Sequence, residues 1–183
     1  MEIINTPIKE LILLNPSQYR DERGVFFETY NKNDFTGAGI AADFVQDNQS
    51  VSRKNVLRGL HFQMPPFEQG KLIRVAKGEV LDVAVDIRRN SETYLKYYSV
   101  NLSEENNLLL WIPPGFAHGF LSLTDGALVM YKCTQLYNKA SERGIRWDDP
   151  DIRIEWGTVS PILSEKDGLL PFVKEFEMII DKK

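Results

Sequence analysis

Apolar and polar residues alternate along much of this chain with a period of two, which is typical of β-strands. The clearest example runs from Glu79 to Ile87, where the residues at every second position are Leu81, Val83, Val85 and Ile87. Because successive side chains of a strand point to opposite faces, these four residues define one apolar face. The segment is therefore expected to be a strand that packs on a core.

Other short segments of the same kind are bounded by turn residues. We expect further strands over residues 24–30, 44–48, 71–76, 97–102, 108–112, 117–123 and 127–134. Asp125-Gly126 between the last two is a strong hairpin signal. Helical pattern is sparse, with possible turns of helix after Asn31, from Ser103 through Asn106, and from Ser164. Many short strands with few helices predict a barrel or a double-sheet jelly roll.

Composition narrows the class of protein. A chain of 183 residues that is 43% hydrophobic fits one globular domain spanning residues 1–183. The net charge of −4 argues against a nucleic-acid binder but leaves an anionic small-molecule ligand open. Cys133 is alone, which fits a reducing compartment, and no apolar run approaches the roughly 20 residues of a membrane helix. We therefore expect a cytoplasmic protein without a membrane or nucleic-acid partner.

Both histidines lie in apolar segments that also contain glycine, Arg58-Gly-Leu-His61 and Gly115-Phe-Ala-His118. Imidazole is the side chain whose ordinary pKa lies near neutrality, so each is a candidate for acid–base chemistry. In a regular strand Arg58 would point away from His61, but a bulge at Gly59 would bring both into one cavity. The alternative is a structural histidine beside a surface arginine, and this segment alone leaves both open.

Lys71 and Tyr131 add a cation and a phenol on strand faces that are otherwise apolar. A base, an acid and a cation that stabilises an enolate are what proton removal beside a ketone requires. A simpler explanation is a lysine solvated at a rim and a core tyrosine with one satisfied hydroxyl. A metal site is the rival hypothesis. The chain has no His-x-His motif and no cysteine pair, although two histidines with distant carboxylates could still bind iron.

A series of motifs stands in order from Arg20 to Asp167. They are Arg20-Asp-Glu-Arg-Gly, Phe44-Val-Gln-Asp-Asn48, Val56-Leu-Arg-Gly-Leu-His-Phe-Gln63, Gln69-Gly-Lys-Leu72, Gly78-Glu-Val, Asp82-Val-Ala-Val-Asp-Ile-Arg88, Trp111-Ile-Pro, Gly115-Phe-Ala-His-Gly-Phe120, Tyr131-Lys-Cys-Thr134 and Arg143-Gly-Ile-Arg-Trp-Asp-Asp-Pro150. The series resembles the dTDP-4-dehydrorhamnose 3,5-epimerase family. This resemblance implies an all-β, cupin-type jelly-roll barrel with a few short helices, which uses no metal or other cofactor. It also implies a homodimer in which N-terminal strands cross to the partner.

The resemblance also implies roles for individual residues. His61 resembles the base that removes protons at C3 and C5 of a 4-keto sugar, and Asp167 resembles its carboxylate partner. Tyr131 resembles the acid that reprotonates the opposite face, and Lys71 the enolate stabiliser. The implied substrate-binding residues are Gln46, Asp47, Asn48, Arg58, His118, Glu142 and Lys166. Arg23, Phe26 and Glu28 resemble residues that contact the nucleotide bound in the neighbouring subunit. The alternative explanation of this segment is purely structural, a turn that leads into an edge strand.

Two positions depart from the family pattern, Gln49 where histidine is common and Leu136 where an aromatic residue is frequent. Neither removes the base or the acid. The expected reaction is double epimerisation of dTDP-4-dehydro-6-deoxyglucose to dTDP-4-dehydro-L-rhamnose. An epimerase acting on C3 or C5 alone, or a ketoisomerase of a related sugar, would share the main residues. A metal-dependent oxygenase and a non-catalytic sugar-nucleotide binding module are the alternatives from other classes.

Overall fold

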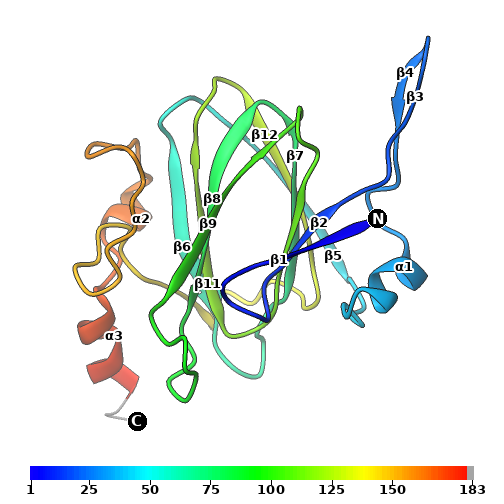
Figure 1. The fold of residues 1–183 in the computed structure, drawn as a ribbon. Coiled ribbons are helices and arrows are strands. Elements are labelled where there is room, and N and C mark those ends of the chain that lie inside the picture. Colours follow the sequence, from blue (N-terminus) through cyan, green and yellow to red (C-terminus); the bar gives the residue numbers. More distant parts are fainter. Residues whose placement is uncertain (181–183) are drawn as a thin grey trace.

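The computed structural model describes residues 1–180 and consists mainly of two facing antiparallel sheets (Figure 1). The six-stranded sheet has the order β1 (Glu2–Asn5), β2 (Ile12–Asn15), β10 (Leu109–Ile112), β7 (Lys71–Lys77), β12 (Ala127–Cys133) and β5 (Gln46–Ser52). The five-stranded sheet has the order β13 (Glu142–Gly144), β6 (Leu57–Gln63), β11 (Phe116–Ser122), β8 (Glu79–Asp86) and β9 (Tyr97–Ser103). The prediction of an all-β jelly roll of the cupin type is confirmed.

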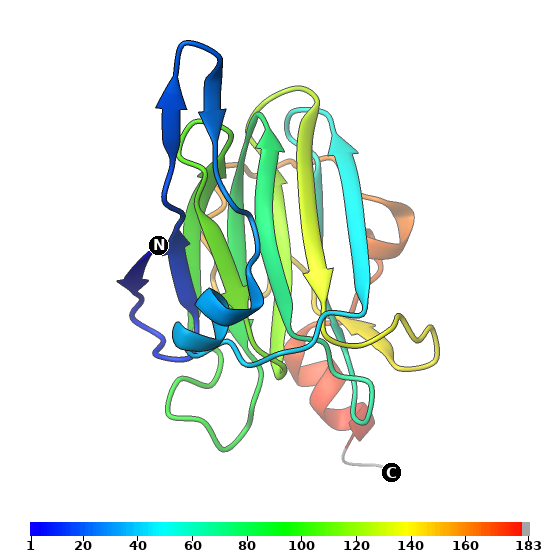
Figure 2. The same ribbon diagram turned by 90° about the vertical axis from the view of Figure 1, so that its right-hand side faces the viewer.

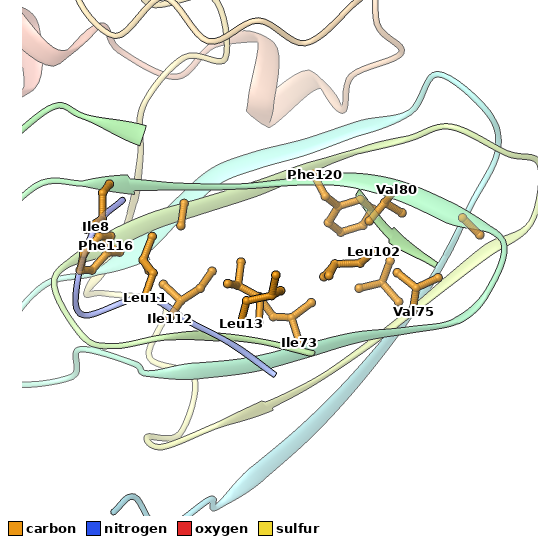
Figure 3. Packing of buried hydrophobic residues seen from close by; sticks show 14 residues of the cluster. Ile8, Leu11, Leu13, Ile73, Val75, Val80, Leu102, Ile112, Phe116 and Phe120 are labelled. Atoms are coloured by element: carbon orange, nitrogen blue, oxygen red, sulfur yellow. The ribbon is translucent and has the colours of Figure 1, made fainter. Parts of the chain in front are cut away.

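The core between the sheets is filled by side chains that point inward from both of them (Figure 3). Ile73 and Val75 of β7 face this core from one sheet, and Val80 of β8 and Phe120 of β11 face it from the other. At these positions no more than 4% of the residue surface is exposed, so the inner faces exclude water almost completely. Burial of this apolar surface is the main force that holds the two sheets together.

The predicted apolar face of β8 is confirmed, but it faces outward. Leu81, Val83 and Val85 pack in a second core under the C-terminal segment, together with Trp156 and Phe176. That segment includes α2 (Glu165–Gly168) and α3 (Val173–Ile180), which cover the five-stranded sheet (Figure 1). The strand is therefore buried on both faces, and its carboxylates lie inside the barrel rather than in water.

The outer face of the six-stranded sheet is partly covered by α1 (Lys32–Gly37) (Figure 2). Asn31 caps this helix, since its side chain accepts a hydrogen bond from the backbone N–H of Asn33. Phe35 then packs with Leu72 and Trp111 in a third apolar cluster. The short hairpin of β3 (Tyr19–Asp21) and β4 (Gly24–Phe26) extends away from the sheets (Figure 2).

Most predicted elements are confirmed within a few residues, including the helices after Asn31 and Ser164. The predicted helical turn from Ser103 is wrong. Ser103 and Asn106 bond each other's backbone N–H groups through their side chains, and Asn107 has a positive φ of 53°, so the chain makes a turn between β9 and β10. The strand expected at residues 24–30 ends at Phe26, and the strand expected from 44 begins at Gln46. β1, β2, β3, β13 and α3 were not predicted.

Candidate active site

A cavity of about 550 Å³ opens between the sheets and is covered on one side by α2 and the loop before it. A neighbouring cavity of about 290 Å³ shares three wall residues with it, His61, Lys71 and Tyr131. The two hollows therefore meet at the residues predicted to carry the chemistry. Together they form a cleft whose walls come from β5, β6, β7, β11, β12 and β13.

A bulge in β6 brings Arg58 and His61 to the same cavity, as one of the two alternatives predicted. His61 pairs with His118 of β11, and Arg58 pairs with Phe120, so the register shifts by one residue between them. Gly59 sits in the bulge with φ +123°, and a Cβ atom there would lie 2.6 Å from the Cα of Gly119. Only glycine combines this backbone conformation with so close a neighbour.

The imidazole of His61 is hydrogen-bonded to the carboxylate of Asp167 in α2. Its Nε2 lies 2.6 Å from Asp167 Oδ1, although the two residues are 106 positions apart. Burial raises the pKa of the Asp167 carboxyl, but hydrogen bonds from His61, the Ser164 hydroxyl and the Gly59 backbone outweigh it and lower that pKa. The carboxylate is thus ionised and fixes Nε2 as the protonated nitrogen, which leaves Nδ1 as the basic one.

Tyr131 and Lys71 face the cavity from neighbouring strands of the six-stranded sheet. Burial raises the pKa of the Tyr131 phenol, so it is a protonated group that can donate a proton. Burial also lowers the pKa of the Lys71 ammonium, against the attraction of Cys133, Asp82 and Glu142. A cation and a phenol thus face the same space as the imidazole of His61.

His118 also lines the cavity, and it is held by a second carboxylate. Its Nε2 lies 3.0 Å from each carboxylate oxygen of Asp82, which is fully buried on β8. Burial lowers the pKa of His118 more than Asp82 raises it, so the imidazole is neutral at neutral pH. Asp82 was not predicted as a site residue. The alternation along β8 could have indicated it, because it places Asp82 on the opposite face of the strand from Leu81 and Val83.

Of the remaining predicted substrate-binding residues, most lie along the cleft. Arg58 and Lys166 line the larger cavity, and Gln46, Asn48 and Glu142 line the smaller one. Lys166 forms an ion pair of 2.6 Å with Glu142, which also accepts a hydrogen bond from the Tyr137 hydroxyl. Tyr137 was not predicted as a site residue, although it directly follows Leu136, a position at which the chain differs from the family pattern.

Four predicted residues lie outside this cleft. Asp47 points to the outer face of the six-stranded sheet, where it pairs with Lys132. Arg23 and Phe26 belong to the projecting hairpin, and Glu28 follows it; all three are exposed. Within one copy of the chain, none of these four lines either cavity.

Among residues 1–176, whose side chains the structure describes, no three histidine, cysteine, aspartate or glutamate side chains cluster closely enough to hold a metal ion. No helix in the described part of the chain is long and apolar enough to cross a membrane.

Comparison with known proteins confirms the resemblance seen in the motifs. A family model described as dTDP-4-dehydrorhamnose 3,5-epimerase matches residues 5–175. The chain is 52% identical to the dTDP-4-dehydrorhamnose 3,5-epimerase of Shigella flexneri over 168 residues, which is 91% of this chain and 93% of that protein.

Two solved structures give the same result. A dTDP-6-deoxy-D-glucose-3,5-epimerase from Legionella pneumophila Philadelphia 1, solved with dTDP-4-keto-L-rhamnose, matches with a TM-score of 0.91 and 46% identity over 94% of this chain and 93% of that one. A 3'-monoepimerase from Streptomyces bikiniensis, solved with dTDP-quinovose, matches with a TM-score of 0.89 and 32% identity over 96% and 89%. This chain therefore belongs to the dTDP-4-dehydrorhamnose 3,5-epimerase family.

Proposed function

We propose that this protein inverts C3 and C5 of dTDP-4-dehydro-6-deoxyglucose and so forms dTDP-4-dehydro-L-rhamnose. The observation that carries the proposal is the convergence of the His61–Asp167 pair, Tyr131 and Lys71 at the junction of the two cavities. Family membership and the ligands named for the related structures supply the class of substrate.

The first step uses His61 as the base. Nδ1 takes the proton from the carbon next to the ketone, the C–H electron pair becomes a C=C bond, and the carbonyl π electrons move to oxygen. Asp167 stabilises the imidazolium that forms, because it is ionised and 2.6 Å from Nε2. The Lys71 ammonium stabilises the enolate oxygen, and its lowered pKa suits it to share a proton with that oxygen.

The second step uses Tyr131 as the acid. Its phenol gives a proton to the other face of the carbon, the enolate reforms the ketone, and the configuration is inverted. This leaves an imidazolium and a phenolate, which exchange with solvent before the second carbon reacts. C3 and C5 both flank the C4 ketone, so one base and one acid serve both carbons. The side chains alone supply this chemistry in the proposal, without a metal or another cofactor.

Substrate binding is proposed to involve residues of two subunits. Within one subunit the proposed contacts come from Gln46, Asn48, Arg58, His118, Glu142 and Lys166. Arg23, Phe26, Glu28 and Asp47 lie away from this cleft, so we assign them to the partner-facing side of a homodimer. The protein is proposed to act in the cytoplasm, where its free thiol, Cys133, stays reduced.

The test is solvent exchange during turnover. Incubation with dTDP-4-dehydro-6-deoxyglucose in deuterated water is expected to place deuterium at both C3 and C5, read by NMR or mass spectrometry. His61→Ala is expected to abolish exchange at both carbons, because the base is gone. No label with the wild-type protein would refute the proposal, and substantial exchange by His61→Ala would refute the assigned base.

A single-carbon epimerase is the second candidate, favoured by the match to the 3'-monoepimerase. It shares the proposed base and acid, so the position of the label separates the two. Label confined to C3 would support the single-carbon reaction and replace the proposal of double inversion.

A further inference from the structure

Strand β5 presents a row of polar side chains to the barrel interior, beside the apolar Ala127 and Val129 of β12. Its inward positions are Gln46, Asn48, Ser50 and Ser52, which alternate with the exposed Asp47, Gln49 and Val51. Residues directly opposite each other on paired strands point to the same face of the sheet. Ser50 lies opposite Val129 of β12, which points into the inner core, so Ser50 also points inward. A row of hydroxyl and amide groups on one wall of a cavity needs hydrogen-bond partners.

Three of these four side chains find partners within the protein. Gln46 Nε2 donates to Asn48 Oδ1 at 3.0 Å, and Asn48 Nδ2 donates to the sulfur of Cys133 at 3.5 Å. Ser52 Oγ accepts a hydrogen bond of 3.1 Å from Arg58 Nε. The fold therefore satisfies the row on both sides of Ser50.

Ser50 is the exception. Over the described part of the chain, its Oγ is the one buried side-chain nitrogen or oxygen atom without a hydrogen-bond partner. The same residue lines the larger cavity, although its Oγ is itself buried, so the hydroxyl must turn about the Cα–Cβ bond to meet a ligand there. A buried hydroxyl without a partner destabilises the folded protein, so an unpaired group beside a cavity indicates a partner that arrives with the ligand.

The position of Ser50 on the sheet indicates which part of the ligand it meets. Tyr131 pairs with Asn48, so Ser50 is its diagonal neighbour on the inner face of the same strand pair. Diagonal neighbours lie close enough for an aromatic side chain to reach across. Ser50 therefore lies on the same face of this strand pair as Tyr131, the proposed acid, and we expect it to face the sugar ring on which that acid acts.

We propose that Ser50 Oγ forms a hydrogen bond with a hydroxyl group of the pyranose ring in the Michaelis complex. The inference rests on the proposed function, since it assumes that a deoxysugar nucleotide occupies the cleft. Ser50 would then contribute to substrate specificity, because a sugar that lacks this hydroxyl group cannot form the hydrogen bond with Ser50.

The experiment compares Ser50→Ala, Ser50→Thr and a control, Ser122→Ala. Ser122 is also buried, but its Oγ donates to the Thr124 carbonyl and it does not line the cleft. Ser50→Ala is expected to raise KM for the sugar nucleotide about 2- to 10-fold, the range for one hydrogen bond between neutral groups. Binding of dTDP, which lacks the pyranose ring, is expected to stay unchanged, and Ser50→Thr is expected to keep the wild-type KM.

Thermal stability separates ligand binding from a structural role. Ser50→Ala is expected to leave Tm unchanged or higher, because it removes an unpaired buried hydroxyl, whereas Ser122→Ala is expected to lower Tm without changing KM. An unchanged KM for Ser50→Ala would overturn the inference, as would an equal loss of dTDP binding. In either case the wild-type protein would still label C3 and C5, so the proposed function would stand.

Discussion

Asp86 is a single residue whose charge state stabilises one end of the barrel. It is fully buried, and burial raises the pKa of its carboxyl, but hydrogen bonds from Arg88, Ser91 and Thr93 lower that pKa to about 2. Because the folded pKa is below the ordinary value of 3.8, the group stabilises the fold above that value. The contribution is about 2 kcal/mol near pH 7 and disappears as the pH falls from about 5 towards 2.

Asp86→Asn is therefore expected to lower the free energy of unfolding by about 2 kcal/mol at pH 7, with about half of that difference from wild type remaining at pH 3. Urea unfolding at both pH values measures it. Asp21→Asn is the matched control, because Asp21 also pairs with an arginine two positions later, but both side chains are exposed. It is expected to change stability little. A loss at pH 3 as large as that at pH 7 would contradict the linkage.

At the residue scale, the sequence reveals chemical type more readily than pairing. The candidate base, acid and cation could be named because histidine, tyrosine and lysine are rare on apolar strand faces. The His61–Asp167 pair spans 106 positions and joins a strand to a short helix, so only the family resemblance indicated it. Asp82 and Ser50 were not predicted as site residues. Alternation gives the face on which Asp82 lies, but the importance of both residues depends on burial and on neighbours across the sheet, which a local pattern does not give.

At the scale of elements, the bulge in β6 is what places Arg58 and His61 on one cavity. Gly59→Ala would bring a Cβ atom to 2.7 Å from the His118 carbonyl oxygen while the backbone stays at φ +123°. We expect a loss of about 3 kcal/mol or more in stability, from positive-φ strain and overpacking together. Deuterium exchange should fall sharply in the folded fraction, because the bulge can relax only by moving Arg58 or His61.

Gly126→Ala is the control for backbone strain alone. Gly126 also has a positive φ, +70°, but an added Cβ would meet no atom within 4 Å. Its expected cost is about 1 kcal/mol, with activity retained. Urea unfolding of the two variants measures the difference, and equal stability would contradict the steric role assigned to Gly59. From the sequence, the bulge at Gly59 was one of two alternatives that stayed open. The outward packing of the β8 apolar face could not be predicted, because a periodic pattern does not say which layer covers it.

At the scale of the whole molecule, the β3–β4 hairpin has no evident role within a single subunit, because it lines neither cavity of its own chain. Tyr19 and Phe26 are 66% and 67% exposed, and their rings pack on each other rather than on the barrel. Exposed aromatic residues on a projecting hairpin are typical of a surface that contacts another molecule. With the proposed homodimer, the hairpin would place Arg23 and Phe26 at the cleft of the partner.

Mixed dimers test this placement directly. His61→Ala lacks the base but keeps its hairpin, and the double variant Arg23→Ala/Phe26→Ala keeps the base but lacks the hairpin side chains; each alone is expected to be nearly inactive. In a mixed dimer one cleft combines the intact His61 of one subunit with the intact hairpin of the other. After unfolding and refolding an equal mixture, about half of the dimers are mixed and each has one complete site, so about a quarter of the wild-type rate should return. If the hairpin served its own subunit, no complete site could form, and the mixture would stay at the average of the two inactive variants.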